Sequence, residues 1–257
     1  MIEAMPQLLP NLDRELAQSL KMLMKKRGIT VCTSARVEAI RQREDGGLVC
    51  EYVFDGQAAA AEADRVLVCV GRHPYTEGLF AEGLRPDTER GRLLVNERYE
   101  TSLPGVYAIG DVIGGVMLAH AVTAEGRNAV QIMAGRPEAA DTRWVPSCIY
   151  TEPEIACVGL TADEARAAGI DADSRKVLMG ANGRTVIAGG ERGYIRVVFE
   201  KETGRLLGAQ IMCERATDLI SEFTQALSAG LTLRELERVI RPHPTFCEAI
   251  TDAVRGR

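Results

Sequence analysis

The first 75 residues alternate between helical and extended patterns of apolar residues. Leucines recur at helical spacing between residues 13 and 27, and Gly28 follows as a helix stop, so this segment predicts an amphipathic helix. Residues 29–33 predict a strand. Residues 65–70 are almost continuously apolar, the pattern of a strand buried on both faces. Shorter apolar stretches between them predict an antiparallel meander with strands at 37–40, 48–54 and 58–63.

The rest of the chain carries a second and a third group of elements. Residues 105–109 predict a strand ending at Gly110, and a glycine-containing loop leads into a helix predicted at 118–134. Further strands are predicted at 147–150, 155–160, 176–179, 194–200 and 206–212, with 185–188 as a weaker candidate. Helices are predicted from Thr161 and Thr232, each with a glutamate at capping-box spacing, and at 216–229. This grouping predicts an α+β module of about 110 residues.

Composition and charge exclude several classes of protein. Of 257 residues, 46% are hydrophobic and 26% are charged, which is typical of a globular protein. Lys and Arg number 31 and Asp and Glu 36, so the net charge is −5, and no basic block favours nucleic acid as a partner. No apolar stretch reaches the roughly 18–20 residues of a membrane span, and no signal peptide opens the chain. We therefore expect a cytoplasmic protein with neither a membrane nor a nucleic-acid partner.

The cysteines indicate reduced thiols rather than a disulfide framework. They are odd in number and scattered, without a CxxC or CxxxxC pair. None lies at zinc-site spacing from the three histidines, so we expect no structural metal. The seven positions are Cys32, Cys50, Cys69, Cys148, Cys157, Cys213 and Cys247.

Two neighbouring segments could bind a ligand near the middle of the chain. Asp111 directly follows a predicted strand, where an acid can accept hydrogen bonds from a sugar or polyol hydroxyl, but Gly110–Asp111 is also a common turn former. The helix expected from Leu118 presents unpaired N–H groups and a partial positive charge at its start. By itself that helix could equally be an ordinary buried one.

His243 lies between two prolines, Pro242 and Pro244, which hold it in a stiff, extended segment suited to an aimed group. Thr245 predicts a helix N-cap with the helix starting at the next residue, and Glu248 then lies close to the imidazole. A carboxylate beside an imidazole fixes its tautomer and stabilises the imidazolium, as a general acid–base requires. The alternative is a Thr245–Glu248 capping box beside a surface histidine.

Glu3 follows a possible strand end, Met1–Ile2. In dinucleotide-binding folds an acid at the end of the second strand binds the adenosine ribose. No glycine fingerprint precedes it here, so the pattern alone does not decide its role.

Taken together, several motifs resemble the pyridine nucleotide–disulfide oxidoreductases, in the form found in dihydrolipoyl dehydrogenases. They occur in that family's order and cover nearly the whole chain. They are the second flavin-binding motif at 101–111, Met-Leu-Ala-His at 117–120 followed by Glu125–Gly126, the start of the interface domain at 146–159, its later motifs at 181–184 and 201–209, and His243-Pro244-Thr245 with Glu248.

This resemblance implies a fold and a division into domains. The fold would be an α/β remnant of FAD/NAD(P)-binding domains followed by an α+β interface (dimerisation) domain. Residues 1–75 would be the C-terminal part of the NAD-binding domain, 76–143 the C-terminal part of the FAD-binding and central domain, and 144–257 the interface domain.

The resemblance also implies two cofactor sites. Asp111 would bind the ribitol hydroxyls of FAD, and Met117, Leu118, Ala119 and His120 would lie against the isoalloxazine ring, with the helix start stabilising negative charge at the flavin N1/O2 edge. Glu3 would bind the NAD ribose and disfavour the 2′-phosphate of NADP. The backbone at Val37 and Gly71 would line the nicotinamide cofactor.

The implied reaction passes electrons from a dihydrolipoyl dithiol through an enzyme disulfide and FAD to NAD, in a role in redox homeostasis. His243, oriented by Glu248, would be its acid–base, delivered to the active site of the other subunit of a homodimer. The implied partner is the lipoylated carrier domain of a 2-oxoacid dehydrogenase or glycine cleavage complex. Arg241–Pro242 stands where the family typically carries His-Ala, which leaves this assignment intact.

Two features of the family are absent from the sequence: the GxGxxG fingerprints and the redox-active cysteine pair. We therefore expect a truncated chain that is not catalytically self-sufficient. Alternatives are a non-catalytic dimerisation module, or a glutathione or mercuric reductase. The Met-Leu-Ala-His and Thr-Phe-Cys-Glu segments favour the lipoyl substrate, and the lack of a C-terminal cysteine pair argues against mercury chemistry.

Overall fold

A computed structural model describes residues 1–10, 12–190 and 193–256. The chain divides into two compact units, Met1–Val70 and Gly71–Arg257. Among the described residues, no helix combines the length and the apolar character needed to cross a membrane.

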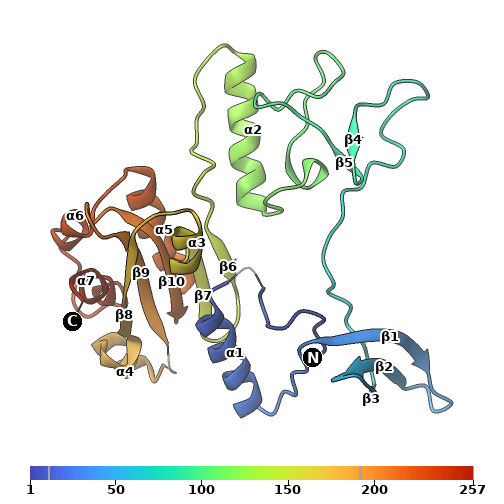
Figure 1. Ribbon diagram of the computed structural model, residues 1–257, viewed down its shortest axis with the longest axis horizontal. Helices are drawn as coiled ribbons and strands as arrows, with labels where there is room; N and C mark the ends of the chain where they lie inside the picture. Colours follow the sequence, from blue (N-terminus) through green and yellow to red (C-terminus); the bar gives the residue numbers. More distant parts are fainter. Residues whose placement is uncertain (11, 191–192, 257) are drawn as a thin grey trace. The chain divides into compact units, whose positions relative to one another are not determined.

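The first unit contains one helix and one small sheet (Figure 1). Helix α1 spans Arg14–Lys26, and the carboxylate of Asp13 accepts the first free N–H groups of the helix as its N-cap. Strands β1 (Ala35–Gln42), β2 (Leu48–Phe54) and β3 (Gln57–Ala63) form an antiparallel sheet in that order. The predicted helix and the predicted meander are therefore confirmed.

Two predicted strands of this unit are wrong. Residues 29–33 contribute only a single parallel bridge, between Cys32 and Ile2. Residues 65–70 are not a strand, and Leu67 and Val70 are 87% and 93% exposed. A buried parallel strand needs a hydrogen-bonded neighbour on each side, and the described residues place none beside this run.

The second unit begins with a small α/β segment that ends in a long helix. Strands β4 (Thr88–Glu89) and β5 (Arg92–Leu93) form a two-stranded ribbon, and a 3₁₀ helix, η1, spans Gly110–Ile113. Helix α2 spans Ala119–Met133, which confirms the helix predicted here. The strand predicted at 105–109 is wrong, because this stretch forms only one bridge, Glu100–Tyr107.

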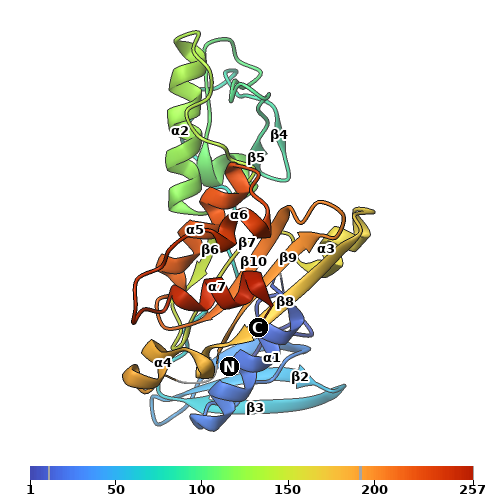
Figure 2. The same ribbon diagram turned by 90° about the vertical axis from the view of Figure 1, so that its left-hand side faces the viewer.

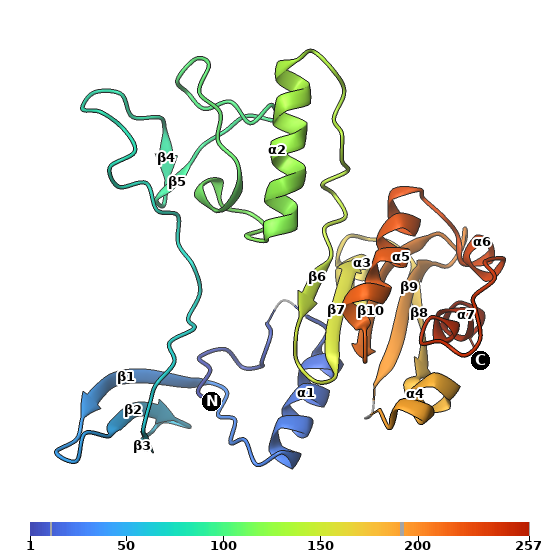
Figure 3. The same cartoon turned by 180° about the vertical axis from the view of Figure 1, so that it is seen from behind.

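An antiparallel sheet of five strands organises the C-terminal part of the second unit, in the order β6-β7-β10-β9-β8 (Figure 3). The predicted strands are confirmed, although β8 starts earlier than expected. Their bounds are β6 Ser147–Ile149, β7 Glu154–Gly159, β8 Ala172–Leu178, β9 Tyr194–Glu200 and β10 Leu206–Cys213.

Helices cover both faces of this sheet. Helices α5 (Ala216–Ser228), α6 (Leu233–Glu237) and α7 (Glu248–Arg255) pack on one face and bury the main core with it (Figure 2). Helix α3 (Ala162–Ala167) packs Ala165 against Val198 and Leu207 on the other face. The domain is thus the α+β module that the sequence predicts.

Side chains that cap helix N-termini explain two correct helix predictions and one wrong strand prediction. Both predicted capping boxes, at Thr161 and Thr232, are present. Residues 185–188, the weaker strand candidate, belong instead to helix α4 (Gly183–Ala188), which follows a short 3₁₀ helix, η2 (Met179–Ala181). The side chain of Asn182 caps α4 by accepting the N–H of Thr185, and this starts a helix where the apolar run alone suggested a strand.

Candidate functional site

The His243 ring and the Glu248 carboxylate form a hydrogen-bonded pair in the second unit. Nδ1 of His243 lies 2.9 Å from Oε1 of Glu248. The His243 side chain is 79% exposed and that of Glu248 is 30% exposed, so the ring projects from the surface while its partner is half-buried. The predicted proximity of the two side chains is therefore confirmed. An imidazole that donates Nδ1–H to a carboxylate keeps Nε2 free to accept a proton.

The backbone around Thr245 holds Glu248 in place. The N–H of Thr245 donates to Oε2 of Glu248 over 2.8 Å, while the Thr245 hydroxyl donates to the carbonyl of Pro242 over 2.6 Å. The predicted helix start is wrong by two residues, because α7 begins at Glu248 with Cys247 as its N-cap. Only half of a capping box forms, since the hydroxyl that would complete it is turned toward Pro242. Each oxygen of Glu248 thus has its own donor.

The Glu248 carboxylate places a negative charge beside the His243 ring. The pKa of Glu248 is lowered, first by the hydrogen bond from the Thr245 N–H and then by the His243 ring. Glu248 therefore stays ionised down to lower pH than an isolated glutamate. Its charge stabilises the protonated imidazole, as a group that alternately takes and releases a proton requires.

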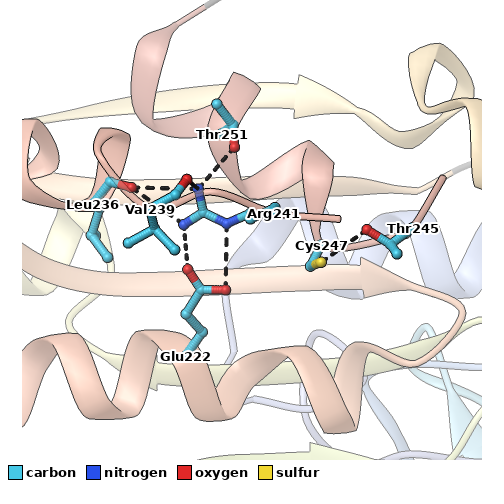
Figure 4. A network of polar contacts seen from close by, with 7 residues as sticks. All are labelled: Glu222, Leu236, Val239, Arg241, Thr245, Cys247 and Thr251. Carbon is cyan, nitrogen blue, oxygen red and sulfur yellow. Dashed lines mark hydrogen bonds and ion pairs between the residues drawn. The ribbon is translucent and has the colours of Figure 1, made fainter. Parts of the chain in front are cut away.

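Two residues that the sequence analysis missed tie this segment to the domain. Asn182 is 5% exposed and donates Nδ2–H to the carbonyl of Thr245 over 3.0 Å. Arg241 is buried in a network of polar contacts with Glu222 and Thr251 (Figure 4). A signal for Asn182 was available in the Ala181-Asn182-Gly183-Arg184 motif. The partner of Arg241 lies 19 residues away, so no local pattern identifies it.

A second candidate site lies at the start of η1 and α2. Gly110 has φ +76°, and a Cβ there would lie 2.9 Å from both methyl carbons of Val122, so only glycine fits. The Gly110 N–H donates to Oε2 of Glu125 over 2.7 Å, which ties this turn to α2. Asp111 follows with an exposed side chain. The turn thus presents a carboxylate close to the first turns of α2.

The start of α2 is open to a ligand. Leu118 is its N-cap, no side-chain hydrogen bond caps the helix, and the first turn holds no acidic residue. Met117 and Leu118 are half-buried, whereas Ala119 and His120 are exposed. Free N–H groups and the partial positive charge of the helix suit an electron-rich ring edge, and Asp111 suits neighbouring hydroxyls. These residues therefore fit the pyrimidine edge and the ribitol of a flavin.

His120 makes a contact that the sequence did not predict. Its Nε2 lies 2.7 Å from the carbonyl oxygen of Pro146, just before β6. Because a carbonyl can only accept, the ring donates through Nε2–H in this contact. His120 thus links the first turn of α2 to the entry of the five-stranded sheet.

The expected nicotinamide-cofactor residues fall into both units. Glu3 lies beside the start of β1, since its carbonyl accepts the N–H of Ala35, and its Oε1 accepts the N–H of Met5 over 2.7 Å. Val37 is an exposed residue of β1. Gly71 has φ +117°, a conformation that favours glycine, and begins the second unit. The structure brings Glu3 near the strand that carries Val37, and Gly71 belongs to the second unit.

The seven cysteines are all free thiols. Burial raises the pKa of Cys157 to about 11 and that of Cys213 to about 12. These two thiols are therefore poor nucleophiles near neutral pH, since the thiolate is the reactive form. Among the described residues, no group of three or more His, Cys, Asp or Glu side chains is placed to hold a metal ion.

Comparison with known proteins matches both parts of the chain to one family. Residues 1–126 match the sequence model of the pyridine nucleotide-disulphide oxidoreductases, and residues 145–254 match that of their dimerisation domain. The chain is 43% identical over its whole length to the dihydrolipoyl dehydrogenase of Thermus scotoductus and 36% identical over 98% of its length to that of Geobacillus stearothermophilus.

The fold agrees with this assignment. The HOCl-induced flavoprotein disulfide reductase RclA from Escherichia coli matches 99% of the chain with a TM-score of 0.89 and 26% identity. The chain spans 56% and 54% of the two dihydrolipoyl dehydrogenases and 58% of RclA, so it covers about half the length of these relatives. Two matched models in family order, close sequence relatives and a shared fold lead to one conclusion: the chain belongs to the pyridine nucleotide-disulphide oxidoreductase family.

Proposed function

We propose that this chain forms the C-terminal part of a dihydrolipoyl dehydrogenase-like flavoprotein, which oxidises a dihydrolipoyl dithiol with NAD. The observation that carries the proposal is the hydrogen bond between Nδ1 of His243 and Oε1 of Glu248 in the interface domain. The 43% identity to a dihydrolipoyl dehydrogenase over the whole chain supports the same substrate class.

In this reaction His243 holds and moves the proton of the thiol. Its Nε2, on the exposed side of the ring, would take the proton of the substrate thiol as that thiol attacks the enzyme disulfide. A mixed disulfide forms, the original S–S bond breaks, and the imidazolium can give the proton to the cysteine thiolate that is released. Glu248 keeps Nδ1 protonated and its charge stabilises the imidazolium. When bound, FAD would supply the two-electron redox chemistry that connects the dithiol with NAD.

The described residues supply only part of the groups needed to pass electrons from the dithiol to NAD. We propose that Asp111 and the start of α2, with Met117, Leu118, Ala119 and His120, hold the ribitol and ring edge of FAD, and that Glu3, Val37 and Gly71 hold NAD. The sequence has no cysteine pair at CxxxxC spacing and no GxGxxG fingerprint. Residues 1–257 therefore do not by themselves supply the reactive dithiol or the pyrophosphate-binding loop of FAD.

We propose that the protein works as a homodimer in the cytoplasm and receives its dithiol from the lipoylated carrier domain of a 2-oxoacid dehydrogenase or glycine cleavage complex. The match to a dimerisation domain supports self-association. Several apolar side chains of that domain are exposed in the single chain, which supports burial against a second copy. Among them are Val186, Ile187 and Ile240, which are 67%, 65% and 95% exposed.

A chimaera tests the proposed substrate. It joins this chain to the part of the Thermus scotoductus enzyme that the chain does not match, and its FAD content is verified by absorbance. We expect oxidation of dihydrolipoamide with NAD to exceed reduction of glutathione disulfide by NADH or NADPH. A flavin-loaded chimaera that prefers glutathione disulfide would contradict the lipoyl assignment.

A further inference from the structure

Arg241 is a buried cation placed two residues before His243. Its side chain is 3% exposed, and its partner Glu222 on α5 is 30% exposed. Arginine is seldom buried to this degree unless its charge is paired and its donors are satisfied. The contacts of this side chain therefore indicate what it holds in place.

The guanidinium of Arg241 reaches three helices at once (Figure 4). Nη2 forms an ion pair with Oε1 of Glu222 on α5, while Nε lies 3.5 Å from Oε2 of the same side chain. Nη1 lies 3.4 Å from the carbonyl oxygens of Leu236 and Val239, at the end of α6, and donates to Oγ1 of Thr251 on α7 over 2.8 Å. The guanidinium thus joins α5, the end of α6, and α7.

Arg241 and Glu248 fix the same segment at its two ends. Thr251 lies three residues after Glu248, on the first turns of α7. The Arg241 side chain therefore attaches the start of segment 241–248 to α7. The carboxylate of Glu248 attaches His243 and Thr245 to the same helix. His243 therefore lies in the short segment between these two points of attachment.

We propose that Arg241 is a positioning residue for His243, which keeps the ring in line with Glu248 through its contacts to α5, α6 and α7. An arginine suits this role because its planar fork offers five N–H donors in fixed directions. A lysine at this position keeps the charge but cannot reach Glu222, the two carbonyl oxygens and Thr251 together. Without the guanidinium group, residue 241 loses its contact with α7, and the His243 ring can turn away from the Glu248 carboxylate.

The tautomer of His243 reports this alignment directly. In protein labelled with ¹⁵N at histidine, two-bond ¹H–¹⁵N correlation spectra at a pH where the ring is neutral show which nitrogen carries the proton. His243→Gln assigns the signals, and His120, which donates through Nε2 to Pro146, supplies an internal Nε2–H reference. We expect the Nδ1–H form for His243 in the unsubstituted chain.

Arg241→Met, Arg241→Lys and Glu248→Gln are each expected to lose the Nδ1–H signature. Arg255→Met is the matched control, because Arg255 on α7 also joins α6, through Glu237 at 3.0 Å, but is 38% exposed. It should leave the tautomer unchanged. Spectra are recorded below the thermal midpoint of each variant. If Arg241→Met does not fold, Arg241→Lys alone decides.

Retention of the Nδ1–H form in any folded Arg241 variant would overturn the proposal, and so would its loss in Arg255→Met. The catalytic consequence rests on the proposed function: in an active chimaera, Arg241→Lys should lower kcat by up to about 10²-fold, the cost of a misplaced catalytic group, with little change in KM. Because the tautomer is measured on the chain itself, an inactive chimaera would count against the proposed function and not against the role of Arg241.

Discussion

At the scale of single residues, Glu248 shows how local hydrogen bonds set the chemistry of a side chain. Its two oxygens accept from Thr245 and His243, and both contacts favour the ionised form. The proximity of these three residues could be predicted from the sequence because they lie within six positions of one another. The contact between Arg241 and Glu222 could not, since it joins residues brought together only by the packing of helices.

Glu248 should make stability depend on pH on the acid side. Its pKa is lower in the folded chain than in the unfolded chain, so its contribution is complete above the unfolded value, near 4.3, and is lost as pH falls through the folded value. We expect urea unfolding to show a steeper loss of stability for the unsubstituted chain than for Glu248→Gln between about pH 5 and pH 3. Parallel curves over this range would contradict the described hydrogen bonds.

The thiols should differ in reactivity according to burial. Cys157 and Cys213, with pKa values raised to about 11 and about 12, hold little thiolate at neutral pH, whereas the Cys69 side chain is exposed. Alkylation with iodoacetamide at pH 7.5, followed by peptide mass spectrometry, should label Cys69 well before the other two. Equal labelling rates in the folded chain would contradict the raised pKa values of Cys157 and Cys213.

Gly110 should tolerate substitution less well than a glycine with the same backbone and open surroundings. Gly110→Ala places a Cβ at φ +76° and 2.9 Å from the Val122 methyls, whereas Gly135 has φ +70° and nothing within 4 Å. Both alanines bear about 1–2 kcal/mol of left-handed strain, and Gly110→Ala adds about 1–3 kcal/mol of overpacking. Denaturant unfolding of both variants measures the difference. Equal losses would mean that the turn at Gly110 does not pack on α2.

At the scale of secondary-structure elements, prediction succeeded where a strand has its hydrogen-bonded neighbours within the described chain or where a helix cap is local. Strands β1 to β3 and β6 to β10 pair with one another within the described chain, and the capping boxes at Thr161 and Thr232 are local. Residues 29–33, 65–70 and 105–109 have strand-like sequences but no full ladder, because a strand exists only beside a neighbour. Residues 185–188 were too short for periodicity to separate strand from helix, and the Asn182 cap decided the outcome.

Asn182 should contribute more than an ordinary helix cap. Its Oδ1 accepts from Thr185 at the start of α4, and its Nδ2 donates to the carbonyl of Thr245. Asn182→Ala should therefore cost the loss of a cap, about 0.5–2 kcal/mol, and a further ~1 kcal/mol for the second hydrogen bond. Thr232→Ala, which removes the side-chain contacts of the capping box at α6, is the control in the same unfolding experiment. A smaller loss for Asn182→Ala than for Thr232→Ala would contradict this account.

At the scale of the whole molecule, the interface domain combines a buried core with exposed apolar side chains. Ile240 is 95% exposed in the single chain although it directly precedes the segment that carries the candidate acid–base pair. A dimerisation domain accounts for such a side chain, since a second copy can cover it.

Ile240→Asp should therefore weaken self-association. A charge buried at an interface without a partner opposes association, so sedimentation should show a dimer for the unsubstituted chain and a shift toward monomer for the variant. Met22→Asp, at a 65% exposed position on α1, is the control and should remain dimeric. A monomeric unsubstituted chain, or an Ile240→Asp variant as dimeric as the control, would contradict the interface assignment.

The central claim is that His243, held by Glu248, moves the proton during dithiol oxidation. The most direct measurement is kcat for dihydrolipoamide oxidation with NAD in the flavin-loaded chimaera, compared with its His243→Gln variant at matched flavin content. A general acid–base contributes roughly 10²–10⁴-fold, and kcat should fall by that factor. Undiminished turnover in His243→Gln would contradict the claim.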